Sequence, residues 1–401
     1  MTYLNAGLAQ DQVFDGRAAM TAVAAMIAVL FAGSTALTPL YIMYKQAFGF
    51  SQITLTLIYA VYVVGNLTAL LFFGRLSDSL GRRPVALAAM AVALVSALVF
   101  MFAHNVASLD VARILSGLAI GVGAGTGTAW LAELIAGDDK SRATLIATST
   151  NFVGLGIGAL VAGLLADYAP LPLRLVFIVY FIALLVVALL VWRTRETAGQ
   201  ASHVRISWRP RLAVPAEIRT AFIAPAVTGF GAMALVGFYA ALAPSILALE
   251  LEVTSHALAG AIFFELAIVA AATILATRRL VSRTAMLTAL GLMIPTAALV
   301  VAAQMLGSMT LMVIATAVCG IAGALGYRGG LQVVNQIAPK ERRAEVVSAF
   351  FICCFCGNAL PVIGVGILST YASPAIASLV FAGVIGLFSL VALGFGLKYA
   401  R

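Results

Sequence analysis

The chain has 401 residues, of which 63% are hydrophobic and only 10% are charged. This composition excludes a soluble domain, because no soluble fold could hide so much apolar surface from water. The net charge of +9 does not indicate nucleic-acid binding, since the basic residues lie in alternate loops and not on one face. Lipid is therefore the expected solvent for most of the chain.

Apolar runs separated by short polar breaks follow one another through nearly the whole chain. A helix that crosses a bilayer needs about 20 apolar residues, and the pattern predicts an all-α membrane protein with twelve transmembrane helices. In chain order the predicted spans are Ala18–Met43, Gln52–Phe73, Pro84–Ala103, Leu109–Ile135, Thr144–Ala166, Leu171–Trp192, Ile218–Leu249, Ala257–Thr277, Ala285–Gln304, Thr310–Ile337, Val346–Tyr371 and Ala375–Leu397.

Positive charge is concentrated in every second loop. The loops that carry it hold Arg17, Arg75 with Arg82 and Arg83, Lys140 with Arg142, the stretch from Arg193 to Arg219, Arg278 with Arg279 and Arg283, Lys340 with Arg342 and Arg343, and the tail Lys398 and Arg401. Basic loops stay on the cytoplasmic side, so both termini are expected in the cytoplasm of a bacterial-type inner membrane. The first span is too long for the apolar region of a signal peptide and is expected to be retained.

The two halves of the chain repeat one another weakly. A shift of roughly two hundred residues lays Ala132–Lys140 over Val334–Arg342, and each segment closes a glycine-rich helix and opens a basic turn. The longest polar stretch lies between the halves. We therefore expect a first six-helix bundle over residues 1–192, a cytoplasmic linker over 193–217, and a second bundle over 218–401.

The turn after the second predicted span reads Gly74-Arg-Leu-Ser-Asp-Ser-Leu-Gly-Arg-Arg-Pro84. It resembles the G-x-L-x-D-x-x-G-R-[RK] signature of the major facilitator superfamily at every key position. The resemblance implies two pseudo-symmetric six-helix bundles that rock about a central site. It also implies that Asp78 faces the start of the eleventh helix, near Glu345 to Ser348, where unpaired amides favour an anion.

Arg82 would meet Glu133 at the cytoplasmic end of the fourth helix and complete a breakable latch between the halves. The simpler alternative is that Arg82 and Arg83 only enforce topology. The residues predicted for the latch are Gly74, Asp78, Gly81, Arg82, Arg83 and Glu133.

Two further motifs resemble elements of the same family. Arg113-Ile-Leu-Ser-Gly117 is similar to its R-x-x-Q-G element, with Ser116 in place of glutamine. In the fifth helix, Gly154, Gly158 and Gly163 fall on the glycines of the G-x-x-x-G-P-x-x-G-G motif of its twelve-helix drug:proton antiporters, with alanine in place of the proline and of one glycine.

Ionisable residues at membrane depth are costly and are functional hypotheses by default. The family links its arginine at Arg113 to proton movement, but Arg113 could equally pair with Asp110 or with backbone carbonyls near the outer surface. Glu265 has no charged neighbour in sequence, and a carboxyl that is neutral when dry and ionised when wet is what proton coupling requires. Arg328 is the counter-charge in the same half, although the helical rise places it deeper toward the cytoplasm. A structural ion pair or a snorkelling arginine is the alternative.

The family's cavity walls are its first, fourth, seventh and tenth helices. This brings forward Tyr41, Tyr44, Phe230, Phe238, Tyr239 and Tyr327 as candidates for an aromatic, mostly neutral lining that suits lipophilic molecules. Each ring could also face lipid or a neighbouring helix.

No pattern in the chain indicates a cofactor, a metal site or an enzyme. There is no G-x-x-x-x-G-K-[ST] phosphate loop, the three histidines have no metal-binding spacing, and the four cysteines lie in apolar helices as small packing residues. The preferred interpretation is a monomeric, proton-coupled exporter of small amphipathic compounds. The alternatives are a transporter of a metabolite such as a sugar, an organic anion or a siderophore, and a membrane sensor that does not transport.

Overall fold

The computed structural model describes residues 14–74, 76–135, 140–198 and 212–399. Arg75 of the motif and residues 199–211 of the predicted linker lie outside these ranges. Within them, twelve helical segments are long and apolar enough to cross a membrane, as predicted.

Ten of the spans are built around single helices, and the first two are composite. The first span consists of α1 (Gly16–Thr35), the 3₁₀ turn η1 (Thr38–Leu40) and α2 (Tyr41–Phe48); the second consists of α3 (Gln52–Ala60), α4 (Tyr62–Thr68) and the π-helix η2 (Ala69–Phe73). The short α5 (Leu76–Leu80) follows. The others are α6 (Arg82–Met101), α7 (Val106–Leu134), α8 (Lys140–Tyr168), α9 (Pro172–Trp192), α10 (Arg219–Leu249), α11 (His256–Ala276), α12 (Ser282–Met305), α13 (Met309–Ile337), α14 (Arg343–Tyr371) and α15 (Pro374–Tyr399), with 3₁₀ turns η3 (Ala216–Ile218) and η4 (Lys340–Arg342) before α10 and α14.

Polar caps explain where several spans begin. Asn105 and Ser108 form a capping box that starts α7 three residues before the predicted Leu109, and the Ser255 and Ser308 hydroxyls accept hydrogen bonds from the amides of Leu258 and Leu311. The internal prolines of α10, α12 and α14 do not end those helices. Pro39 does lie at a break, because it is the second residue of η1, between α1 and α2.

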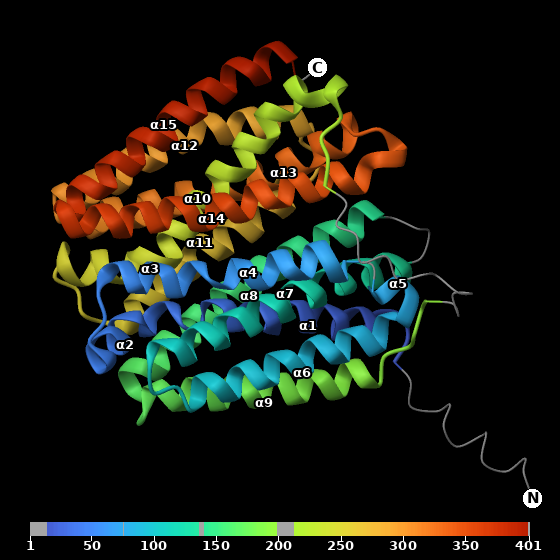
Figure 1. Cartoon of the computed structure of the whole chain (residues 1–401), viewed down its shortest axis with the longest axis horizontal. Coiled ribbons are helices and arrows are strands. Elements are labelled where there is room, and N and C mark those ends of the chain that lie inside the picture. The colour runs from blue at the N-terminus through green and yellow to red at the C-terminus, as the bar shows by residue number, and fades with distance from the viewer. Residues whose placement is uncertain (1–13, 75, 136–139, 199–211, 400–401) are drawn as a thin grey trace, which may run out of the picture.

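The helices form two groups that lie side by side (Figure 1). Helices α1 to α9 make up the blue-to-green group and α10 to α15 the yellow-to-red group; we call them the N-half and the C-half. Helix α1 begins and α15 ends at the same end of the molecule, which we call the termini end. The opposite end, with the turns at 49–51, 102–105, 250–255 and 372–373, is the far end.

Two seams join the halves. Helix α8 packs along α11, and α3 packs against α14. At the far end, η1 contacts both α10 and α11, and α2 contacts α10. Most of the hydrophobic core belongs to a cluster that includes residues of both halves, such as Leu40, Leu55, Phe238 and Phe263.

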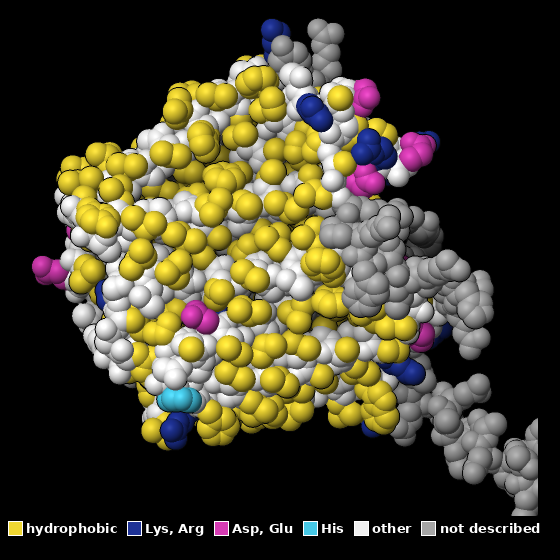
Figure 2. Space-filling view, viewed as in Figure 1, with side chains coloured by type: hydrophobic (Ala, Val, Ile, Leu, Met, Phe, Trp, Pro, Cys, Tyr) yellow, Lys and Arg dark blue, Asp and Glu magenta, His cyan; other side chains and the backbone are white. Residues whose placement is uncertain are grey.

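The outer surface is mostly hydrophobic, with most of the visible charged side chains toward its two ends (Figure 2). Large apolar side chains such as Val186 and Leu387 are exposed by 55% and 60%. Such a band is expected where helices face lipid, so the apolar surface by itself indicates a bilayer and not a protein partner.

Glycines bring helix backbones into contact inside the N-half. A Cβ atom on Gly117 of α7 would lie 2.0 Å from the carbonyl oxygen of Tyr62, and one on Gly65 of α4 would lie 2.1 Å from that of Ile114. The two helices are thus interlocked by reciprocal glycines, which let helix backbones approach closely in lipid.

Candidate functional site

The motif turn is a network of hydrogen bonds around Arg82. The Nη2 atom of Arg82 lies 2.7 Å from Oε1 of Glu133 on α7, and its Nη1 atom donates to Ser77 at 2.7 Å and to Asp78 at 2.5 Å. The predicted contact between Arg82 and Glu133 is therefore present. It joins α5, α6 and α7 within the N-half.

The predicted contact between Asp78 and the start of α14 is not among the described hydrogen bonds. Arg82 lies one helical turn away and takes the carboxylate instead. The start of α14 has no side-chain cap, and Glu345 pairs there with Arg342 at 2.9 Å. The Asp78 side chain is still 53% exposed. Among the described contacts Asp78 is bound within the N-half, so the contact expected to latch the two halves is not formed in this structure.

Glu196, which no sequence motif indicated, takes part in the same turn. Its two carboxylate oxygens accept hydrogen bonds from the backbone amides of Arg82 and Arg83, both at 2.9 Å, at the start of α6. A Cβ atom on Gly81 would lie 2.8 Å from Oε2 of Glu196, and Gly81 has a φ of 98°. Only glycine suits this position of the motif, since it must meet both conditions.

Residues 193–198 are packed onto the N-half and not free as part of a linker. The amide of Phe14 donates to the carbonyl of Arg193 at 2.7 Å, and the amide of Arg195 donates to that of Phe14 at 3.1 Å. The hydroxyl of Thr197 donates to Glu133. The Gly16 amide, together with the Arg195 guanidinium, lowers the pKa of Asp15 from its usual value.

Arg113 is fully buried and binds backbone carbonyls. Its guanidinium donates to the oxygens of Ser34 at 2.8 Å, Tyr59 at 3.1 Å and Ile58 at 3.3 Å. Helix α3 ends at Ala60, so its last carbonyls have lone pairs available inside the protein. Of the alternatives left open by the sequence, the structure shows the carbonyl partners; Asp110 does not pair with Arg113 in any described contact.

A polar contact between the halves lies next to Arg113. The hydroxyls of Tyr59 and Tyr62 both donate to Oδ1 of Asn358 on α14, at 2.8 and 2.6 Å, and the Asn358 amide nitrogen donates to the carbonyl of Met233 at 3.3 Å. The Arg113 guanidinium carbon lies 4.8 Å from the centre of the Tyr62 ring. Sequence reasoning missed this network, although an asparagine in an apolar span was a signal that could have been pursued.

Glu265 and Arg328 do not pair in this structure. Arg328 donates to the carbonyl of Thr277 at 2.5 Å, to its hydroxyl at 2.9 Å and to the carbonyl of Leu280 at 2.9 Å. Glu265 lies twelve residues before Thr277 on α11, which is about 18 Å along the helix axis. Glu265 is half-buried and has no partner among the described hydrogen bonds.

Only part of the predicted aromatic wall is accessible. Tyr41 and Tyr44 are 1% exposed, and Phe238 and Tyr239 are completely buried, so these four rings belong to the packed core and do not line a cavity here. The reason is that η1, α2 and α10 close against one another at the far end. Phe230 and Tyr327 are partly accessible.

The glycines of the antiporter-like motif hold α8 between two neighbours. Cβ atoms on Gly154 and Gly158 would lie 2.2 and 2.1 Å from the carbonyl oxygens of Ala28 and Ala32 on α1. One on Gly163 would lie 2.4 Å from the carbonyl of His256, at the start of α11 in the C-half. The first two glycines therefore pack within the N-half, and the third packs across the seam.

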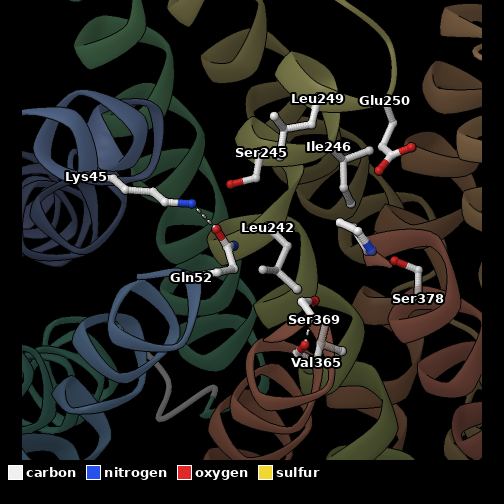
Figure 3. A pocket seen from close by; sticks show the side chains of 11 residues that line it. Lys45, Gln52, Leu242, Ser245, Ile246, Leu249, Glu250, Val365, Ser369 and Ser378 are labelled. Carbon is white, nitrogen blue, oxygen red and sulfur yellow. Dashed lines mark hydrogen bonds between the residues drawn. The ribbon is translucent and has the colours of Figure 1, made fainter. Parts of the chain in front are cut away.

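A pocket of ≈ 210 Å³ opens at the far end between the halves (Figure 3). Its walls come from the ends of α2, α10 and α14 and the starts of α3 and α15: Lys45, Gln52, Leu242, Ser245, Ile246, Leu249, Glu250, Val365, Ser369, Pro374 and Ser378. The Lys45 ammonium donates to Gln52 at 2.9 Å on one side of the pocket, and Glu250 lies on the other side.

A family model described as "Major Facilitator Superfamily" matches residues 23–362. The chain belongs to this superfamily. Among curated relatives, an uncharacterized transporter of Rickettsia felis is 29% identical over 121 residues, which are 30% of this chain and 29% of the relative. The multidrug resistance protein MdtL of Klebsiella pneumoniae is 31% identical over 101 residues, a quarter of each chain. The matches thus span less than a third of these relatives.

Solved structures of superfamily transporters share the fold along nearly the whole chain. The human organic anion transporter MFSD10 aligns with a TM-score of 0.64 at 16% identity, over 94% of this chain and 99% of its own. A bacterial homologue of the human lysosomal transporter Spinster, in an inward-facing and unoccupied conformation, aligns with a TM-score of 0.69 at 15% identity, over 96% of both chains. At this level of identity the comparison concerns the fold alone.

Proposed function

We propose that this major facilitator protein is a proton-coupled exporter of small lipophilic or amphipathic compounds, and that it works by alternating access with the termini end in the cytoplasm. Transport is supported most directly by the motif turn. Arg82 is held in place by Glu133 and Glu196, while the Asp78 carboxylate, which is bound to Arg82, remains half-exposed and can exchange that partner for another.

Export is supported by the local similarity to MdtL and by the glycine packing of α8. Proton coupling is supported by Glu265. A carboxyl that is half-buried in a spanning helix, with no described partner, can gain and lose a proton as its surroundings dry and wet during the cycle. The distance to Arg328 means that Glu265 would act without that arginine.

Proton flux in sealed proteoliposomes tests the proposal. The protein is reconstituted with a trapped pH dye, and lipophilic cations, neutral drugs and organic acids are added in turn. We expect proton movement opposite to a cation or neutral compound. Glu265→Gln should abolish the coupled flux, and Asp78→Asn should abolish transport while leaving membrane insertion intact.

Glu252→Gln is the matched control for Glu265→Gln, because it makes the same chemical change at an exposed position. Full coupled transport by Glu265→Gln would exclude the carboxyl as proton carrier. Flux only with an organic acid would favour the anion-transporting alternative, which the name of the structural neighbour MFSD10 brings forward.

A further inference from the structure

The far-end seam between α8 and α11 contains an acid of the N-half that caps a helix of the C-half. Asp167 lies in the last turn of α8. Its Oδ2 atom accepts hydrogen bonds from the Ser255 hydroxyl at 2.7 Å and the Ala257 amide at 2.8 Å, and its Oδ1 atom accepts from the His256 amide at 3.1 Å. The ring Nδ1 atom of His256 lies 2.8 Å from the same Oδ1 atom.

These contacts satisfy the free amides at the start of α11. Asp167 takes the amides of the first two helical residues, and the Ser255 hydroxyl takes the amide of Leu258 at 3.1 Å. Three of the four amides that a helix start leaves unpaired are thus occupied, two of them by a carboxylate from the other half of the protein. Both side chains of the Asp167–His256 pair are less than a quarter exposed, so water screens the interaction only partly.

The backbone around Asp167 is built for this approach. Gly163 lies one turn earlier on α8 and has no room for a side chain against His256. Gly260, one turn into α11, would place a Cβ atom 2.4 Å from the carbonyl of Ala159. The two helices therefore meet backbone to backbone where the carboxylate reaches across.

At the repeat-related seam, between α3 and α14, the described residues form no such cap. The hydroxyl of Ser51 caps α3 as that of Ser255 caps α11, but Ser369 at the end of α14 donates to Val365 in its own helix. The far-end pocket lies at this second seam (Figure 3). Of the described ion pairs, those of Arg82, Arg195 and Arg342 lie within one half, and Asp167–His256 joins the halves.

We propose that Asp167 is a positioning residue of the transport cycle that locks the far end, and that its carboxylate must leave the start of α11 before this end can open. The inference rests on the proposed alternating access. At the termini end, Asp78 and the uncapped start of α14 offer the same chemistry, an N-half acid and a C-half helix start. Opening one end and closing the other would then exchange one capped helix for the other.

A distance measurement between the halves tests the lock. Spin labels are attached at His104→Cys and Leu306→Cys, two exposed far-end turns in opposite halves, after Cys319, Cys353, Cys354 and Cys356 have been replaced by alanine. Pulsed electron spin resonance in nanodiscs then gives the ratio of far-end-open to far-end-closed molecules. We expect Asp167→Ala to raise this ratio about tenfold or more, and Asp167→Asn to raise it less, since an amide still accepts hydrogen bonds but has no charge.

Asp110→Ala is the matched control, because Asp110 is a half-buried N-half acid near the same end without a described partner across the seam. Asp78→Asn should shift the ratio the other way. If Asp167→Ala does not fold, Asp167→Asn carries the test, since it preserves shape. Distance distributions unchanged from the parent and from Asp110→Ala would overturn the lock. The spin labels report the conformation of the far end whichever substrate is transported. The test of the lock therefore remains valid even if the protein is not a drug:proton antiporter.

Discussion

Arg113 and Arg328 lie in helices that the internal repeat pairs with one another, α7 and α13, but they bind different parts of their halves. Arg113 on α7 is fully buried and donates to the ends of α1 and α3. Arg328 is 8% exposed and donates to the turn between α11 and α12. Neither has a carboxylate partner among the described ion pairs.

The comparison shows how a membrane protein can keep an arginine without an acid. The last carbonyls of a helix carry partial negative charge and have no partner of their own. At Arg113 the helix end lies inside the bundle, because α3 stops at Ala60 and α4 starts at Tyr62. At Arg328 the helix end is an ordinary turn near the surface. An arginine that binds backbone carbonyls therefore stabilises the break between α3 and α4 inside the N-half, and the turn between α11 and α12 near the surface of the C-half.

Replacing each arginine by alanine should give the largest difference in stability between the two sites. Arg113→Ala leaves three carbonyls without a donor in a dry interior, and we expect a loss of roughly 3 kcal/mol or more of stability. Arg328→Ala should lose about half of that, because water can reach the turn. Thermal unfolding in detergent measures the loss of stability in each variant, and size-exclusion chromatography checks that each variant is monodisperse. Equal losses in the two variants would contradict the distinction between the sites.

Replacing each arginine by lysine should also distinguish the two sites, with a smaller difference in stability. The ammonium of Arg113→Lys cannot span three oxygens on two helices, so we expect it to recover little of the stability lost in Arg113→Ala. Arg328→Lys should recover most of its loss, since both backbone oxygens belong to one turn and water can supply the remaining contacts. The same unfolding assay applies. If Arg113→Lys recovered the lost stability, the positive charge would matter at this position and the several N–H donors of the planar guanidinium would not.

The smallest effect concerns the nearer of the two tyrosine rings under the Arg113 guanidinium, that of Tyr62; the described contacts of Arg328 include no ring. Tyr62→Phe keeps the ring under the guanidinium but loses the hydrogen bond to Asn358, which should cost about 1 kcal/mol. Tyr62→Leu also loses the cation–π contact, and we expect a further loss of about 0.5–1 kcal/mol. If the two variants are equally stable, the contact with the ring adds nothing to the carbonyl bonds.

The number of spans and their limits could be predicted because they depend on local composition and caps. The contact between Arg82 and Glu133 was also predictable, since a family motif fixes it. The partners of Arg113 were left as alternatives because carbonyls carry no signature in sequence. Asn358, Asp167 and Glu196 were missed for a related reason: each gains its role from helices far away in the chain, which meet only after the bundle has formed.

Aromatic residues at cavity positions were the least predictable. Tyr41, Phe238 and Tyr239 lie on helices that the family uses as cavity walls, but whether such a ring faces an opening depends on how the halves are tilted. That tilt is set by contacts such as those between η1 and α10, which no single stretch of sequence encodes.

The packing of residues 193–198 onto the N-half decides where this protein can be divided. Two gene fragments split before Arg193 would deprive the first fragment of Glu196 and Thr197, which hold the start of α6 and Glu133. A split after Ala198 would leave that corner complete. Co-expression of fragments cut at the second position, and not at the first, is therefore the route to a reassembled transporter.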